Sequence, residues 1–128
     1  MSNRAEALID LTAIAANVKK LKADSGTSLM AVVKADAYGH GLVPVANAAL
    51  AAGADWLGVA LVEEAHKLRN EGVTAPILAW LVSPGSDYAA AIAANIDLAV
   101  PSLDIFHEIL ATGKKARIHI EVDTGMRS

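Results

Sequence analysis

The sequence predicts an α/β fold in which parallel strands alternate with helices, and the spacing of its apolar segments supports this prediction. Short runs typical of strands recur every 20 to 26 residues, starting near Met30, Trp56, Ile77, Asp97 and Arg117. One segment with helical periodicity lies in each interval, as in β/α repeats with right-handed crossovers. The glycines between residues 39 and 41 do not complete the Gly-x-Gly-x-x-Gly fingerprint of dinucleotide folds, which favours a barrel over a doubly wound sheet.

A complete barrel of this kind has eight strands and about 250 residues. The 128 residues supply five such strands after an N-terminal one and end in a loop at residues 123–128. We therefore expect a partial (β/α)8 TIM-type barrel with parallel strands, its N-terminal part only, in which both edges of the sheet lack a neighbouring strand.

The composition argues against several classes of function. With 54% hydrophobic residues the chain can bury one modest core, and the absence of cysteine excludes disulfides and thiolate metal sites, as is typical of a cytoplasmic protein. A net charge of -3 and 4% aromatic residues argue against a nucleic-acid partner. The N-terminus lacks the apolar core of a signal peptide, and no charge-free run approaches the roughly 18 residues of a membrane helix, so we expect no membrane association.

The pattern of the N-terminal region predicts a short strand followed by a helix. Polar and apolar side chains alternate over residues 5–10, as in a strand. Apolar residues then follow helical spacing, at Leu11, Ile14, Ala15, Val18 and Leu21. Asp10 or Thr12 caps this helix, and residues 24–26 end it. Three lysines in its last turns are interpreted as a solvated helix end, namely Lys19, Lys20 and Lys22.

The alternation continues to the end of the chain. Further helices are predicted at residues 42–52, 62–70, 88–94 and 103–111. Further strands are predicted at residues 56–60, 77–81, 96–100 and 117–122.

Lys34 stands near the end of an apolar, β-branched strand that begins at Leu29, just before a glycine-containing turn. Strand alternation places Lys34 on one face with Met30 and Val32, so that it projects from the carboxyl end of the strand, where barrel active sites lie. An ammonium group on such a strand is costly unless it is paired, extended to solvent or reactive. Position alone leaves these alternatives open.

Two other groups of polar residues occupy positions suited to a site. On the last strand, Arg117, His119, Glu121 and Asp123 share one face, which is either an electrostatic network inside the barrel or a solvated edge. Tyr38 and His40 flank Gly39 in the loop before a helix, where backbone N–H groups can bind a phosphate, or else they are ordinary loop residues.

The motif around Lys34 resembles a known one. Residues 31–41 read AVVKADAYGHG and are similar to the pyridoxal-phosphate motif of bacterial alanine racemases. Other pieces follow the order and spacing of that family, at residues 7–11 with Asn17, and at 58–60, 63–65, 68–72, 76–78 and 122–126. The resemblance identifies residues 1–128 as the N-terminal portion of a pyridoxal-phosphate-binding barrel, without the remainder of the barrel and the C-terminal β-rich domain.

The resemblance implies an isomerase that acts as a homodimer and interconverts L-alanine and D-alanine for peptidoglycan. It also implies that this chain, without the rest of the protein, does not racemise alanine. Lys34 would be the Schiff-base lysine for pyridoxal 5'-phosphate and would carry the proton on one face of the substrate. Tyr38 would hydrogen-bond the phosphate. A tyrosine from the other subunit would serve the opposite face.

Two positions depart from the family pattern. Glu121 stands where the family often has a lysine, sometimes carbamylated, and we hypothesise that its carboxylate replaces the negative charge of the carbamate. The family places a substrate-orienting arginine two residues after the methionine, whereas Arg127 follows Met126 directly. Arg127 is thus a substrate-binding candidate that is one residue out of register. No spacing of His, Asp and Glu resembles a metal site.

Two alternative functions are compatible with the same residues. Another barrel enzyme that uses pyridoxal phosphate, such as an amino-acid decarboxylase or a different racemase, would differ in its substrate profile. A noncatalytic half-barrel would bind the cofactor or a partner without turnover.

Overall fold

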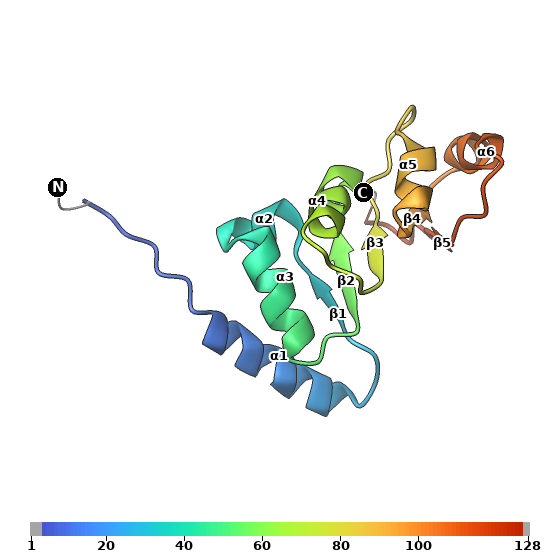
Figure 1. The fold of residues 1–128 in the computed structure, drawn as a ribbon. Helices are drawn as coiled ribbons and strands as arrows, with labels where there is room; N and C mark the ends of the chain where they lie inside the picture. The colour runs from blue at the N-terminus through green and yellow to red at the C-terminus, as the bar shows by residue number, and fades with distance from the viewer. Residues whose placement is uncertain (1–3, 127–128) are drawn as a thin grey trace.

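Within residues 4–126, which the computed structural model describes, five strands form one parallel sheet in the order β1-β2-β3-β4-β5 (Figure 1). The strands are β1 (Met30–Val32), β2 (Trp56–Val59), β3 (Ile77–Ala79), β4 (Ile96–Val100) and β5 (Ile118–Ile120). The helices are α1 (Leu11–Ser25), α2 (Lys34–Gly39), α3 (Leu42–Ala51), α4 (Val62–Asn70), α5 (Tyr88–Ala93) and α6 (Leu103–Ala111).

The strands are arranged in space in the same order as along the chain. A doubly wound sheet reverses its direction of growth at a switch point, whereas a barrel adds each strand beside the previous one. Each strand here pairs in parallel with the next, for example Val32 with Gly58 and Gly58 with Leu78. The prediction of an α/β fold of the barrel type is therefore confirmed, and the strand order decides what periodicity left open.

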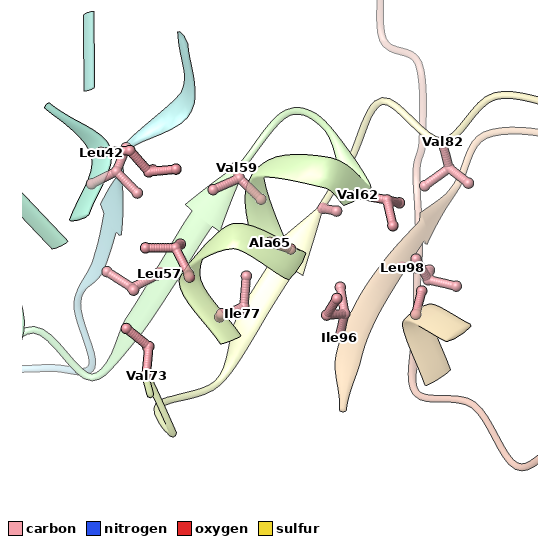
Figure 2. Close-up of a cluster of buried hydrophobic side chains, with 14 of the residues drawn as sticks. Leu42, Leu57, Val59, Val62, Ala65, Val73, Ile77, Val82, Ile96 and Leu98 are labelled. Carbon is pink, nitrogen blue, oxygen red and sulfur yellow. The ribbon is translucent and has the colours of Figure 1, made fainter. Parts of the chain in front are cut away.

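The hydrophobic core lies between the sheet and the helices that cover one of its faces (Figure 2). Alternate strand residues such as Leu57, Ile77 and Leu98 are fully buried there, in one cluster with Ala65 and Leu68 of α4. The intervening residues point to the opposite face, which we call the inner face because it faces the axis of a barrel. Its members from the strands and their carboxyl ends include Met30, Val32, Lys34, Trp56, Gly58, Leu78, Trp80, Asp97 and His119.

The predicted strand at residues 5–10 is wrong. This segment has no strand partner within the described residues, and Leu8 is 87% exposed. Alternation alone does not form a strand, because a strand requires hydrogen bonds to a neighbour. The segment instead supplies the N-cap of α1, as the Asp10 carboxylate accepts a hydrogen bond from the Ala13 amide at 3.0 Å.

The interpretation of the lysines at the end of α1 holds only in part. Lys20 forms an exposed ion pair with Asp24, four residues further along the helix. Lys22 instead reaches the Asp55 carboxylate just before β2, and this contact lowers the pKa of Asp55. Because Asp55 also accepts the Leu29 amide at 2.7 Å, Lys22 joins α1 to the entrances of β1 and β2.

The other predicted elements are present. The bounds of α4, α6 and β4 agree with the prediction, α3, α5, β2 and β3 are shorter by one or two residues at their carboxyl ends, and β5 is shorter at both ends. The strand predicted from Leu29 is also shorter than expected, because β1 ends at Val32 and Lys34 already begins α2. Within residues 4–126, no helix is both long and apolar enough to cross a bilayer.

Candidate active site

Lys34 lies just beyond the carboxyl end of β1, as the first residue of α2, and its amine lies over two aromatic rings. Val33 is buried on the core side, which turns the next residue toward the inner face. Lys34 Nζ lies 5.8 Å from the centroid of the Tyr38 ring and 5.7 Å from that of Trp80. Among residues 4–126, no carboxylate lies within ion-pair distance of this amine. The structure therefore excludes one of the alternatives that the sequence left open, in which Lys34 is paired with an acidic side chain.

The residues after Lys34 form a left-handed turn, which the sequence prediction of a simple loop did not include. From Ala35 to Tyr38 the φ angles are 51 to 55° and the ψ angles 38 to 49°. L-amino acids disfavour this conformation by roughly 1–2 kcal/mol per residue, so four consecutive residues require strong compensation. One turn separates Lys34 from Tyr38, and the turn thereby brings the Tyr38 ring back over the lysine amine.

Hydrogen bonds within the segment stabilise part of this turn. The Ala37 amide donates to the Val33 carbonyl at 2.9 Å, and the Gly41 amide donates to the Asp36 carbonyl at 2.9 Å. The Asp36 carboxylate accepts the Leu42 amide at 2.8 Å, which caps the start of α3. Gly41 has φ 97°, a value that suits glycine, at the exit from the turn.

Tyr38 and His40, which were predicted as a pair, have different environments. Tyr38 is 66% exposed, and its hydroxyl has no hydrogen-bond partner among the described residues. The Nδ1 atom of His40 lies 2.9 Å from the Ala37 carbonyl and so interacts with the turn itself. Tyr38 is therefore available to a ligand beside Lys34, whereas His40 has a local structural contact.

Trp80 was missed by the sequence prediction, and a glycine on the neighbouring strand explains its position. Gly58 lies in the middle of β2 without a positive φ angle. A Cβ atom at this position would lie 2.7 Å from Cζ3 of Trp80 and 2.9 Å from Sδ of Met30. A glycine inside a strand is a signal of close approach by another group, and it could have indicated this contact.

We expect Gly58→Ala to lower the free energy of unfolding by about 1–3 kcal/mol, because the added methyl group overlaps the Trp80 ring. Thermal or urea unfolding measures the change. Trp80→Leu in the same chain should recover part of the loss, since it removes the atoms that collide. Equal losses with and without Trp80→Leu would contradict this explanation.

A second polar group lies on the inner face, centred on a buried carboxylate. Asp97 is 2% exposed; its Oδ1 accepts Arg117 Nε at 2.7 Å, and its Oδ2 lies 3.0 Å from His119 Nε2. His119 also meets the Trp56 ring edge-on, with centroids 5.9 Å apart. The polar face predicted for β5 therefore belongs, for Arg117 and His119, to the inner face of the sheet.

Asp97 itself was not among the site residues predicted from the sequence. It is an acidic residue within an otherwise apolar strand, Ile96–Val100, and such a residue requires partners when it is buried. That signal could have linked it to the basic residues 20 and 22 positions further along the chain. Asp97 pairs with Leu78, two residues before Trp80, so this group lies toward the amino ends of the strands relative to Lys34.

The remaining candidates are only partly described. Glu121 is half-buried after β5 and lines an open hollow of about 320 Å³ together with Phe106 and Ile118. Its predicted role stays a hypothesis. Arg127 lies outside the described residues. Within residues 4–126, no cluster of His, Cys, Asp and Glu could hold a metal ion.

The loop after β3, which follows Trp80, is held by two side chains of the helices. The Tyr88 hydroxyl donates to the Ser83 carbonyl at 2.8 Å, and the Glu108 carboxylate accepts the Gly85 amide at 2.8 Å. Burial, and secondarily the nearby Glu108, raises the pKa of Tyr88 to about 12. Tyr88 therefore remains a hydrogen-bond donor at neutral pH.

Comparison with known proteins gives consistent matches over the described fold. Residues 9–127 match the family model described as alanine racemase, N-terminal domain. The chain is 51% identical over 131 residues to an alanine racemase of Thermobifida fusca, a match that covers 98% of this chain and 35% of that protein. It is 50% identical over 127 residues to an alanine racemase of Salinispora arenicola, which covers 96% and 34% respectively.

Solved structures show the same similarity. The alanine racemase from D-cycloserine-producing Streptomyces lavendulae superposes with a TM-score of 0.89 at 46% identity, over 94% of this chain and 33% of that one. The alanine racemase from Bacillus anthracis, solved with bound L-Ala-P, gives 0.84 at 40% identity, over 93% and 32%. The chain thus spans about a third of the length of the curated relatives it matches.

Proposed function

This chain belongs to the alanine racemase family, and from that premise we propose that it forms the N-terminal, cofactor-binding part of a pyridoxal-phosphate-dependent alanine racemase. The complete protein would interconvert L-alanine and D-alanine. The observation that carries the proposal is the position of the Lys34 amine, just beyond the carboxyl end of β1 and over the rings of Tyr38 and Trp80.

The residues around Lys34 fit pyridoxal phosphate. The amine has no acidic partner among residues 4–126, so it is available for a carbonyl carbon, and the Trp80 ring and Met30 provide an apolar wall. The exposed Tyr38 hydroxyl is a donor for a phosphate oxygen. When bound, this cofactor supplies an electron sink that makes the Cα proton of an amino acid removable.

In this proposal Lys34 has two roles. It holds the cofactor through Nζ, and the same nitrogen then moves a proton to and from one face of the substrate Cα. A tyrosine of a second subunit serves the opposite face, so the working enzyme is a homodimer. We further propose a cytoplasmic location and a role in supplying D-alanine for peptidoglycan.

We expect Tyr38→Phe to weaken pyridoxal phosphate binding by roughly 10-fold, because one hydrogen bond to a charged phosphate oxygen is lost. Titration of the apoprotein, followed by cofactor absorbance, gives the dissociation constant. Tyr88→Phe is the matched control, since it also removes a tyrosine hydroxyl, but one on α5 that donates to the Ser83 carbonyl. Unchanged affinity in Tyr38→Phe would contradict the role assigned to Tyr38.

The proposed reaction is tested with the complete protein that contains this chain. L-alanine should be converted to an equal mixture of the two enantiomers when pyridoxal phosphate is present, as measured by chiral chromatography. Release of CO2 would contradict this proposal and indicate a decarboxylase. Turnover of a different amino acid without turnover of alanine would indicate another racemase.

A further inference from the structure

The left-handed turn of α2 depends on one side chain from another part of the chain. The Ala35 amide, at the start of the turn, donates to Oε1 of Glu64 at 2.6 Å, across 29 residues of sequence. Within the residues that the structure describes, Glu64 is the one side chain from outside residues 33–42 that hydrogen-bonds to this segment. The turn is therefore completed from α4.

The second oxygen of Glu64 holds the carboxylate in place. Its Oε2 accepts the amides of Ala60 and Leu61, at 3.0 and 2.9 Å. These amides lie between the end of β2 and the first turn of α4, where a negative charge also complements the helix dipole. One carboxylate oxygen thus binds the segment after β1 and the other binds the segment after β2, so Glu64 joins the carboxyl ends of these two strands.

The peptide that Glu64 binds is the one that follows Lys34. Its orientation sets the direction in which the Lys34 side chain leaves the backbone, and it begins the turn that returns Tyr38 to Lys34. A change in this hydrogen bond therefore acts on both residues at once, although Glu64 itself is on a different helix.

We propose that Glu64 is a positioning residue that keeps residues 35–38 left-handed and so holds Tyr38 over the amine of Lys34. For its effect on the cofactor, this inference rests on the proposed function of Lys34. Its effect on the turn is independent of any cofactor.

The test compares Glu64→Gln with Glu63→Gln in the complete protein. Both substitutions remove one negative charge from the first turn of α4, but Glu63 is exposed and makes no hydrogen bond to the turn. A glutamine amide has one acceptor oxygen, so it cannot accept from both sides of the site. Glu64→Asp keeps the charge and shortens the reach, and it serves as a second variant.

The first measurement is amide hydrogen exchange of the apoprotein. Residues 35–39 should exchange about 10-fold faster or more in Glu64→Gln and Glu64→Asp than in the wild type, while Glu63→Gln matches the wild type. The peptides of β3, β4 and α6 should not change. Unchanged exchange at residues 35–39, or a uniform increase over the whole chain, would overturn the proposal.

The second measurement is the affinity for pyridoxal phosphate, which should fall roughly 10-fold in Glu64→Gln and stay at the wild-type value in Glu63→Gln. Equal affinity in all three proteins would overturn the link between the turn and the cofactor. A wild-type protein that does not bind the cofactor would contradict the proposed function instead, and the exchange measurement would still decide the role of Glu64.

Discussion

Lys34→Ala in the complete protein is expected to lower alanine racemisation by at least about 10³-fold, the largest effect we predict for any single change. Two functions are lost together, because Nζ both holds the cofactor and carries the proton on one face of Cα. The absorbance near roughly 420 nm that is typical of the lysine-bound cofactor should disappear as well. Chiral chromatography and absorbance spectroscopy measure these two losses.

Lys67→Ala is the matched control for this change. It removes an exposed lysine from α4 and should leave both measurements at the wild-type level. Borohydride reduction of the wild-type holoenzyme should attach the cofactor covalently to Lys34, which peptide mass spectrometry can locate. A covalent label on another lysine, or racemisation that survives Lys34→Ala, would contradict the assignment of Lys34.

The position of Lys34 could be predicted from the sequence, because it follows from one-dimensional rules. The alternation of side chains along β1 and the regular spacing of β/α units place it at the carboxyl end of a strand. Tyr38 was also a candidate, since it follows Lys34 in one conspicuous motif. The bounds of α4 and α6 agreed with the prediction because helical spacing of apolar residues defines both, with Ser102 as the N-cap of α6. Those of β4 agreed because it is a short, largely apolar run between two helices.

The parts of the site that could not be predicted depend on contacts between distant elements. The turn at Ala35–Tyr38 contains no glycine, so its left-handed conformation contradicts local preference and is held by Glu64 from α4. Trp80 reaches Lys34 only because Gly58 leaves room beside it. For such residues the sequence shows a conflict with local rules, and the tertiary structure shows what resolves it.

The buried carboxylate of Asp97 leads to the second large prediction, which concerns stability. Arg117→Met should lower the free energy of unfolding by about 3 kcal/mol, because the buried carboxylate loses its guanidinium partner and keeps only the His119 ring. Asp97→Asn should have the smaller effect, about 1 kcal/mol, because the Arg117 side chain is 62% exposed and water can solvate its charge.

The asymmetry between these two variants distinguishes a buried pair from a surface pair, in which either partner could be removed at similar small cost. Urea unfolding of this chain, in which the Arg117 side chain is 62% exposed, is a suitable measurement. Tryptophan fluorescence can follow it, since Trp56 contacts His119 in the same group. Lys115→Met removes a neighbouring exposed cation that lines the same hollow as Arg117, and it should change stability by less than about 0.5 kcal/mol.

The double variant Asp97→Asn/Arg117→Met should be more stable than the sum of the two single losses predicts, because the unpaired buried charge is then absent. Additive losses would mean that Asp97 and Arg117 act independently, and His119 would then be the partner that compensates the carboxylate.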